Sequence, residues 1–294
     1  MALAAGVTAP LGLDSYLPVP EDNPITREKA ALGRALFHEK MLSRDRTVAC
    51  ASCHEEEKAF SDGKPLAVGI EGRVGTRRSP AIVNRVFGKS FFWDGRAKSL
   101  EEQALQPIPN PKEMDLPLAE AVERLRRSAY AEDFRKVFAR EVNAEDLGRA
   151  VATYVRTILS GDSPYDRYMA GDQGAMTAEA REGLRLFRGK AGCVRCHVGF
   201  NFTDERRHNT GAGKIDTDGL FKTPTLREVA RHAPYMHDGS MASLRDVIEF
   251  YDKGGKANPR LDPEIRELKL TDGEKKALAA FLESLSGRLT EGFH

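Results

Sequence analysis

The pattern Cys-x-x-Cys-His occurs twice in this chain, at residues 50–54 and at residues 193–197. It is typical of covalent c-type haem attachment, in which each thiol bonds one vinyl group of a porphyrin and the histidine ligates the iron. One copy would also fit a zinc half-site or a redox dithiol, but a four-cysteine zinc site needs no histidine after each pair. The sequence therefore predicts two covalent haems. The residues expected to hold the haems are Cys50, Cys53, His54, Cys193, Cys196 and His197. These include all four cysteines of the chain.

A second similarity links the two motifs, because each follows a short helical stretch that ends in Leu-Phe. Residues 32–37 (Leu-Gly-Arg-Ala-Leu-Phe) precede the first motif, and residues 183–187 (Gly-Leu-Arg-Leu-Phe) precede the second. A repeated unit of helix, loop and attachment motif indicates an internal duplication. We therefore expect a mainly α protein of two cytochrome c-like domains, each with one haem. The linker is expected at residues 161–164, so that the domains span residues 1–163 and 164–294.

The composition argues against several other classes of protein. The chain has 294 residues, of which 40% are hydrophobic and 30% charged, as is ordinary for one large or two medium globular domains. Its net charge of +1 gives no reason to expect a nucleic acid partner, and no apolar run approaches the ~20 residues of a membrane span. Residues 1–6 lack the basic and apolar segments of a signal peptide. A periplasmic location is expected from the haem motifs alone, because covalent haem is attached outside the bacterial cytoplasm.

Helical periodicity and capping residues predict much of the secondary structure. Apolar residues recur at helical spacing over residues 143–160. Ser99 with Glu102, and Thr271 with Glu274, each form the pattern of an N-terminal capping box. Strand signals are sparse, which supports a mainly α fold.

Six stretches of the chain occur in an order shared with a known family. Besides the two attachment motifs they are Phe92-Trp93-Asp94-Gly95-Arg96, Glu102-Gln103 with Pro107 and Glu113, Thr223-Pro224-Thr225-Leu226-Arg227, and Ala233-Pro234-Tyr235-Met236-His237-Asp238-Gly239. In these stretches the chain resembles the bacterial di-haem cytochrome c peroxidase and MauG superfamily. The resemblance extends from about residue 25 to residue 285, which is nearly the whole chain.

The resemblance implies roles for several residues. His54 would ligate the iron of the haem at which peroxide reacts, and Glu113 would be the distal acid–base residue. Gln103 and Pro107 match the other distal-pocket positions, a polar group and a rigid turn. Trp93, the only tryptophan of the chain, matches a position between the two haems that relays electrons. Without the resemblance, Glu113 fits a solvated surface carboxylate and Trp93 fits a buried core aromatic.

Two departures from the general family pattern indicate a MauG-like subtype. Members that need reductive activation have a histidine that caps the first iron, and this chain has Ile70 at that position. The first haem is therefore expected to be open. Where typical peroxidases place a methionine ligand to the second iron, this chain has Tyr251, as MauG-type proteins do. A phenolate is a harder ligand than a thioether, so the second haem is expected to have a low potential. Met236 and Met241 are the alternative ligands.

The resemblance also implies a calcium ion between the domains, held by an asparagine side chain and backbone carbonyls. This chain has Arg78 at the asparagine position. The carbonyls of His232 and Pro234 could still serve as ligands, and Asn84 lies nearby in the sequence. The calcium expectation therefore depends on these groups.

Together these features favour a periplasmic oxidoreductase that reacts with hydrogen peroxide and shares two oxidising equivalents between its haems through Trp93. The MauG-like features predict long-range oxidation of a protein substrate. A second hypothesis is a cytochrome c peroxidase that takes electrons from a small cytochrome or cupredoxin and reduces peroxide to water. A third is a non-catalytic di-haem electron carrier, which would need a sixth ligand on both irons.

Overall fold

Helices carry most of the regular structure, as predicted from the sequence. The computed structural model describes residues 6–213 and 218–293, so the expectation for residues 1–6 falls mainly outside the described range. The helices are α1 (Arg27–Phe37), α2 (Leu100–Leu105), α3 (Leu118–Arg126), α4 (Tyr130–Phe138), α5 (Ala144–Arg156), α6 (Pro164–Met169), α7 (Ala178–Arg188), α8 (Leu244–Asp252) and α9 (Asp272–Glu283). The strands are β1 (Leu159–Gly161), β2 (Arg207–His208), β3 (Phe221–Lys222) and β4 (Arg288–Thr290). Within the described residues, no helix combines the length and apolarity that crossing a bilayer requires.

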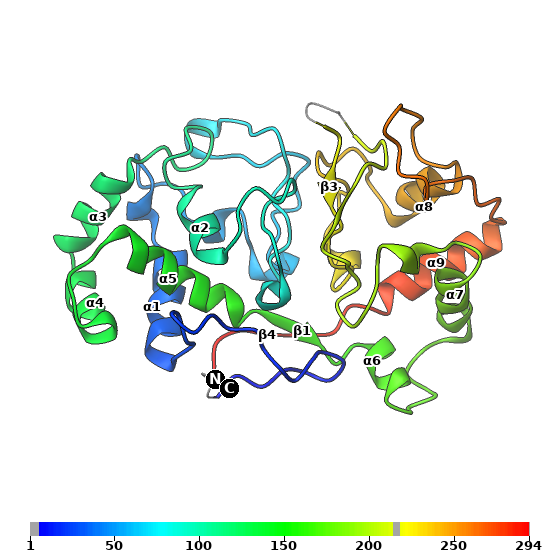
Figure 1. The fold of residues 1–294 in the computed structure, drawn as a ribbon, viewed down its shortest axis with the longest axis horizontal. Helices are drawn as coiled ribbons and strands as arrows, with labels where there is room; N and C mark the ends of the chain where they lie inside the picture. Colours follow the sequence, from blue (N-terminus) through cyan, green and yellow to red (C-terminus); the bar gives the residue numbers. More distant parts are fainter. Residues whose placement is uncertain (1–5, 214–217, 294) are drawn as a thin grey trace.

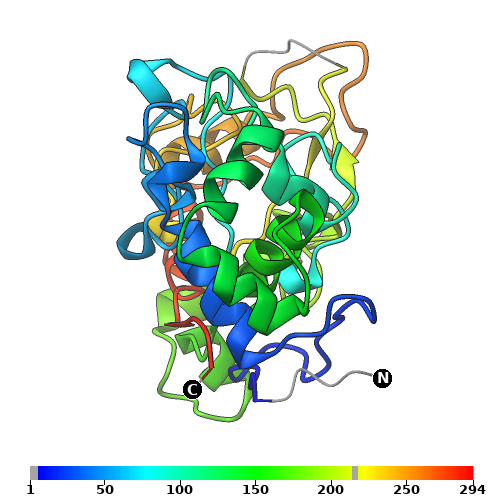
Figure 2. The same ribbon diagram turned by 90° about the vertical axis from the view of Figure 1, so that its left-hand side faces the viewer.

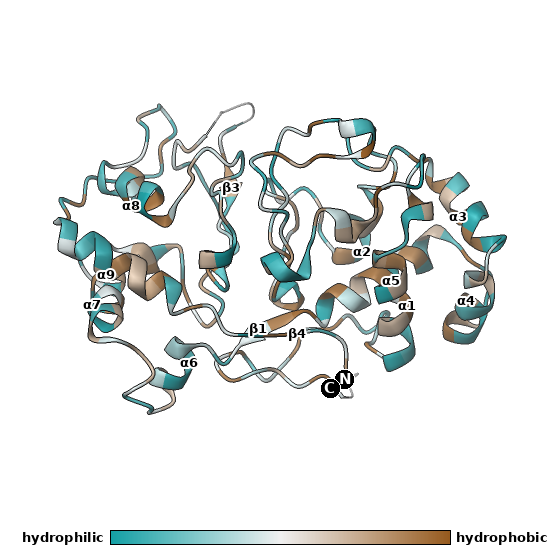
Figure 3. Cartoon of the chain, turned by 180° about the vertical axis from the view of Figure 1, so that it is seen from behind, coloured by the Kyte–Doolittle hydropathy of each residue, from teal (hydrophilic) through white to brown (hydrophobic). Residues whose placement is uncertain are grey.

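The chain folds into two lobes that lie side by side in Figure 1. Helices α1 to α5 belong to one lobe and α6 to α9 to the other. Each lobe has its own cluster of buried hydrophobic side chains, drawn from residues 32–158 in the first and residues 176–285 in the second. In Figure 3 the outer helices α3 and α4 are largely hydrophilic, whereas α5 is hydrophobic along much of its length. Helix α5 is therefore the central core element of its lobe.

The same helix crossing occurs in both lobes. Helix α1 packs against α5, and α7 packs against α9; Figure 2 views the molecule from the side of the first lobe, which contains the first of these pairs. A Cβ atom on Gly33 would overlap the backbone carbonyl of Ala150, and one on Gly183 would overlap that of Ala277. Only glycine lets the two backbones approach this closely. The repeated sequence before each attachment motif thus corresponds to a repeated packing arrangement.

The predicted capping residues begin α2 and α9. The backbone N–H of Glu102 donates to Oγ of Ser99 at 3.1 Å, and that of Glu274 donates to Oγ1 of Thr271 at 3.2 Å. These side chains satisfy N–H groups that have no partner inside the helix. Both residues are N-caps as predicted, but the full capping box is present only at α9, because the carboxylate of Glu102 accepts from the backbone N–H of Lys98 instead of that of Ser99.

The prediction of one helix over residues 143–160 is wrong at its C-terminal end. Helix α5 stops at Arg156, and the residues that follow form β1. Strand β1 pairs antiparallel with β4, with Leu159 opposite Thr290. Ile158, just before β1, and Leu159, within it, are buried like the apolar residues of α5, and Ile158 keeps the helical spacing. The partner strand lies near the C-terminus, which periodicity within one segment cannot reveal.

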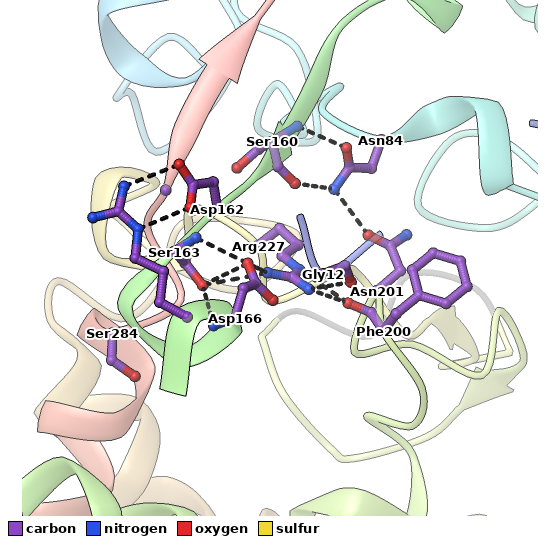
Figure 4. Close-up of polar contacts among 12 residues, drawn as sticks. Gly12, Asn84, Ser160, Asp162, Ser163, Asp166, Phe200, Asn201, Arg227 and Ser284 are labelled. Carbon is purple, nitrogen blue, oxygen red and sulfur yellow. Dashed lines mark hydrogen bonds and ion pairs between the residues drawn. The ribbon is translucent and has the colours of Figure 1, made fainter. Parts of the chain in front are cut away.

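A buried ion pair lies where the chain passes from one lobe to the other (Figure 4). Arg227 is fully buried, and its Nη1 donates to Oδ2 of Asp166 at 2.6 Å. Its Nη2 donates to the carbonyl oxygens of Gly12 and Phe200, at 3.1 Å and 2.6 Å. One guanidinium therefore joins the N-terminal arm (the described residues before α1), the first turn of α6 and the loop after the second attachment motif.

Candidate di-haem site

The two attachment motifs lie on short 3-10 turns. The first turn spans Cys50–Ser52 and the second Cys193–Arg195. The backbone N–H of His54 donates to the carbonyl oxygen of Cys50 at 3.0 Å, and that of His197 donates to the carbonyl oxygen of Cys193 at 2.9 Å. Each motif is thus folded into one tight turn that holds two thiols and one imidazole.

Both motif histidines are held in the tautomer that leaves Nε2 free. Nδ1 of His54 lies 3.0 Å from the carbonyl oxygen of Phe60, and Nδ1 of His197 lies 2.9 Å from that of Phe202. A carbonyl oxygen only accepts, so Nδ1 carries the proton and the lone pair of Nε2 is available to a metal. Burial lowers the pKa of both rings, which favours the neutral form that binds iron.

A single cavity of 660 Å³ connects the two motifs. Cys53 and His54 line it from one lobe, and Cys193, Cys196 and His197 line it from the other. More of its surface is apolar than polar, as is usual for sites that bind organic cofactors. The structure therefore brings together two motifs that lie far apart in the sequence.

The residues around this cavity fit two covalent haems. None of the four cysteines forms a disulfide, so each sulfur is available for the thioether bond that covalent haem attachment requires. Two buried nitrogen atoms of lining residues, Nε of Arg78 and Nε2 of His232, have no hydrogen-bond partner among the described residues. A porphyrin has an apolar ring for such a cavity and carboxylates that unpaired nitrogen atoms can bind.

The predicted distal residues line this cavity together. Gln103 comes from α2, and Pro107 and Glu113 come from the turn that follows α2. Nδ2 of Asn110 donates to Oε1 of Glu113 at 2.7 Å. Burial raises the pKa of Glu113, while the charge of Arg96 and the hydrogen bond from Asn110 act in the opposite direction. A carboxyl group whose pKa is moved toward neutrality can both take up and return a proton.

Ile70 occupies the position at which part of the family has a capping histidine. It lies next to Glu113 but outside the cavity. Its side chain is fully buried and is not part of the cavity lining. Its backbone N–H donates to the carbonyl oxygen of Glu113 at 2.9 Å. This position therefore supports the backbone of Glu113, and its hydrocarbon side chain cannot ligate iron.

Trp93 is held between segments of the two lobes. It lines the cavity, and its indole Nε1 donates to the carbonyl oxygen of Arg78 at 2.9 Å. Its own carbonyl oxygen accepts from the backbone N–H of Lys222, at the end of β3, at 2.8 Å. The indole is thus anchored in one lobe and its backbone in the other.

Helix α8 turns one face toward the same cavity. Leu244, Val247, Ile248 and Tyr251 all line it, at the spacing of one helical stripe. Burial raises the pKa of the Tyr251 phenol to about 12, and a hydrogen bond with Thr210 acts in the opposite direction. Tyr251 therefore lines the cavity as a half-buried residue.

Met236 and Met241, the alternatives to Tyr251 as ligand of the second iron, lie in different places. Met236 lines the cavity, as do His197 and Tyr251. Met241 instead packs against the hydrophobic cluster of the second lobe. Of the two methionines, only Met236 lines the cavity that also holds His197.

Comparison with known proteins identifies the family. The sequence matches the Di-haem cytochrome c peroxidase family over residues 27–174. It is 42% identical to the methylamine utilization protein MauG of Methylorubrum extorquens over 286 residues, which cover 92% of this chain and 81% of that protein. The chain belongs to the di-haem cytochrome c peroxidase and MauG family. Membership implies two c-type haems and an oxidoreductase of the peroxidase type.

Other relatives include both named branches of this family. The cytochrome c551 peroxidase of Nitrosomonas europaea is 33% identical, over 98% of this chain and 88% of that protein. A crystal structure of a MauG-like protein associated with microbial copper homeostasis superposes with a TM-score of 0.84 and 32% identity, covering 94% of this chain and 95% of the other. The fold expected from the sequence, mainly α and of the di-haem peroxidase and MauG type, is thereby confirmed.

Several of the groups expected to hold calcium already form hydrogen bonds with other groups of the protein. Nη2 of Arg78 donates to the carbonyl oxygen of His232 at 2.6 Å. The amide of Asn84 is also engaged, because its Oδ1 accepts from the backbone N–H of Ser160 at 2.8 Å and its Nδ2 donates to the carbonyl oxygen of Ser160 at 3.0 Å (Figure 4). Calcium requires about six to eight oxygen ligands that are free to turn toward it.

Sequence reasoning missed two contributors to the site. Asn110 lies three residues before Glu113, and an amide at that spacing in a turn is a signal that could have been used. The carbonyl groups that orient the two histidines belong to Phe60 and Phe202, and a backbone carbonyl has no signature in the sequence.

A third missed feature is a histidine held between two carboxylates at the edge of the second haem site. Nδ1 of His208 lies 2.6 Å from Oδ2 of Asp262, and its Nε2 lies 2.8 Å from Oδ2 of Asp204. Burial lowers the pKa of His208, but the two carboxylates raise it by more, so it lies above the ordinary value. Asp262 and Asp204 come from different loops, and their meeting depends on the tertiary fold.

Proposed function

We propose that this chain is a periplasmic di-haem enzyme that reacts with hydrogen peroxide and uses the two oxidising equivalents to oxidise a protein substrate. The observation that carries the proposal is the shared cavity, which both attachment motifs, Glu113, Trp93 and Tyr251 line. Such continuity is what two haems that exchange electrons require. The haem held at His54 would supply the iron at which peroxide is reduced.

We further propose that each haem belongs to one of two domains, residues 1–163 and 164–294. The separate hydrophobic clusters and the repeated helix crossing support this division. The described elements that cross the boundary are the N-terminal arm, which reaches Arg227, and β4, which pairs with β1. The proposed peroxide site therefore lies in the first domain and the proposed electron-storing site in the second.

The proposed role of Glu113 is to move one proton. As a carboxylate it would take the proton from peroxide in the cavity, and as a carboxyl it would return that proton to the departing oxygen. Asn110 donates to Oε1 of Glu113, and Oε2 would be the atom that exchanges the proton with peroxide. Gln103 would hold oxygen or water nearby, and Pro107 shapes the turn, since its carbonyl oxygen accepts from the backbone N–H of Asn110 at 3.3 Å.

The proposed role of Trp93 is to shorten electron transfer between the two haem sites. Its indole is easily oxidised and is fixed by a hydrogen bond at Nε1, so it needs little rearrangement when it gains or loses an electron. Tyr251 would hold the second iron together with His197, since both line the cavity. An anionic oxygen ligand stabilises the oxidised form of iron more than a thioether does. The second site would then hold an oxidising equivalent until a protein substrate docks.

A second candidate is a cytochrome c peroxidase that takes electrons from a small redox protein. It is favoured by the relatives that are named as such peroxidases. Ile70 is compatible with both candidates, because it leaves the first iron without a capping histidine. Tyr251 favours the first candidate.

Electron paramagnetic resonance of the fully oxidised protein, before and after one equivalent of peroxide, tests the proposal. We expect one high-spin and one low-spin ferric signal, both of which disappear when peroxide is added. Two low-spin signals that ignore peroxide would contradict it and would favour an electron carrier. Rapid steady-state peroxide consumption with a reduced small cytochrome would favour the peroxidase.

A further inference from the structure

Arg78 connects both lobes to Trp93. Its side chain is buried, and Nη2 donates to the carbonyl oxygen of His232 at 2.6 Å and to Oγ of Ser61 at 3.0 Å. Its backbone N–H donates to the carbonyl oxygen of His237 at 2.9 Å, and its own carbonyl oxygen accepts from Nε1 of Trp93 at 2.9 Å. Ser61 follows the first attachment motif, whereas His232 and His237 belong to the second lobe. Arg78 therefore contacts the loop after the first attachment motif, the indole of Trp93 and the second lobe.

The charge of this guanidinium has a buried counterpart. Asp62 is 1% exposed, and its Oδ2 accepts from Oγ of Ser79 at 3.1 Å. The carbonyl oxygen of Ser79 accepts from Oγ of Ser61, which also binds Arg78. Burial lowers the pKa of Arg78 and the charge of Asp62 raises it. An arginine remains protonated in proteins, so the site contains one buried positive and one buried negative charge.

A divalent cation does not suit this arrangement. It would need the carbonyl oxygen of His232 as a ligand at about 2.3–2.6 Å, and the guanidinium already donates to that oxygen. A cation there would lie beside the fixed positive charge of the guanidinium, which would repel it. The Arg78 guanidinium and a divalent metal ion would therefore compete for the same carbonyl oxygen and repel each other.

We propose that the Arg78 guanidinium takes the place of a bound metal cation at the junction of the two lobes. Its fork of N–H donors gathers carbonyl and hydroxyl oxygens, as a calcium ion would, but at the cost of one charge rather than two. The junction is therefore complete without calcium. It follows that electron transfer between the haems should not depend on calcium. This consequence rests on the proposed function of Trp93, whereas the absence of calcium binding does not.

The test uses the protein with both haems attached, in wild-type form and as Arg78→Gln and Arg78→Lys. The matched control is Arg127→Gln, which removes one exposed arginine that pairs with Glu123 on the surface of α3. Each protein is treated with EGTA and then titrated with calcium chloride in a calorimeter. Bound calcium is measured by atomic emission, and the thermal unfolding midpoint is measured with and without EGTA.

We expect the wild-type protein to contain no stoichiometric calcium and to bind none in the titration. Its thermal unfolding midpoint should be the same with and without EGTA. Arg78→Gln should lower the midpoint by several degrees more than Arg127→Gln, and Arg78→Lys, which keeps a buried cation, should lose less. One tightly bound calcium per wild-type chain would overturn the proposal, as would Arg78→Gln behaving like Arg127→Gln. If Arg78→Gln does not fold, the wild-type and Arg78→Lys titrations still decide.

These readouts do not involve peroxide. Calcium binding by wild type would therefore overturn the role of Arg78 and leave the proposed reaction untouched. Conversely, a protein that ignores peroxide but binds no calcium would refute the proposed function and retain the inference. The reduction potentials of the two haems, measured with and without EGTA, separately test the consequence for haem-to-haem transfer.

Discussion

At the scale of single residues, Glu113 is the group whose chemistry is most directly testable. Glu113→Gln keeps the size of the side chain and a hydrogen bond with Asn110 but removes the titratable proton. We expect the second-order rate constant for reaction with peroxide to fall by about 10²–10⁴-fold, the usual contribution of a general acid–base. Stopped-flow absorbance measures it, with Glu123→Gln on the surface of α3 as control. A Glu113→Gln protein that reacts as fast as wild type would exclude the role.

Tyr251 carries a prediction about redox potential. Tyr251→Met replaces an anionic oxygen ligand by a thioether, which stabilises reduced iron. We expect the reduction potential of the second haem to rise by more than about 0.1 V, within the ~0.8 V that axial ligands span. Spectroelectrochemical titration measures both haems, and the first haem serves as the internal reference. An unchanged second potential would mean that Tyr251 does not ligate iron, and Met236 would become the candidate.

His208 gives a pH dependence of stability. Its pKa in the folded protein is above the ordinary ~6.5, so its contribution is fully present below that value and is lost as the pH rises through the folded pKa. The reason is that a neutral imidazole can donate to only one of Asp204 and Asp262. We expect His208→Gln to cost about 1.5–3 kcal/mol of unfolding free energy near pH 6 and distinctly less near pH 9. Urea unfolding measures this, and the exposed His38→Gln is the control; an equal loss at both pH values would contradict it.

The residues of the site could be named from the sequence to the extent that their chemistry is local. The attachment motifs are local, because cysteines and histidine act within one turn. Glu113 and Trp93 could be named only through the family resemblance, since nothing in their neighbourhood distinguishes them from a surface carboxylate and a core aromatic. The support of Glu113 by the backbone of Ile70 was not predictable, because a backbone hydrogen bond between distant segments leaves no mark on side-chain identity.

At the scale of helices, the close crossing before each motif predicts an unusual sensitivity to one methyl group. Gly183→Ala in α7 places a Cβ atom against the carbonyl of Ala277 in α9, and the two helices must separate. We expect a loss of about 1–3 kcal/mol of unfolding free energy. Gly273→Ala in the first turn of α9 is the matched control, because its Cβ meets nothing closer than 3.9 Å. It should be neutral or stabilise by up to about 1 kcal/mol. Equal effects of the two substitutions in chemical denaturation would refute the crossing argument.

Elements whose signals are local were predicted well, and elements that depend on distant partners were not. Ser99 and Thr271 cap helices because their hydroxyls reach N–H groups three residues ahead. Leu159 follows α5 with the same burial but forms a strand, because Thr290 lies opposite it. The difference is decided by a segment near the C-terminus. Local periodicity therefore shows which side chains are buried more reliably than it shows how the backbone is bonded.

At the scale of the whole molecule, the two lobes are joined by terminal segments of the chain that cross from one lobe and contact the other. The arm near Gly12 reaches Arg227 of the second lobe. In return, β4 follows the second lobe in sequence and pairs with β1, and the carboxylate of Glu291 binds Arg34 of α1 at 2.9 Å. Because both ends of the chain cross the junction, separating the lobes requires several distant contacts to break together.

The buried pair of Arg227 and Asp166 is the contact in this junction whose loss should cost most. Asp166→Asn leaves a fully buried guanidinium without a counter-ion, which typically costs about 3–5 kcal/mol. Asp246→Asn is a matched control, because Asp246 forms the same capping box with Ser243 at α8, is exposed, and forms no ion pair with an arginine in the part of the chain that the structure describes. Its loss should cost about 1 kcal/mol or less. The difference between the two in urea unfolding therefore isolates the ion pair from the cap. If both variants lose the same free energy, the ion pair does not stabilise the junction, and the backbone contacts of Arg227 to Gly12 and Phe200 must hold it instead.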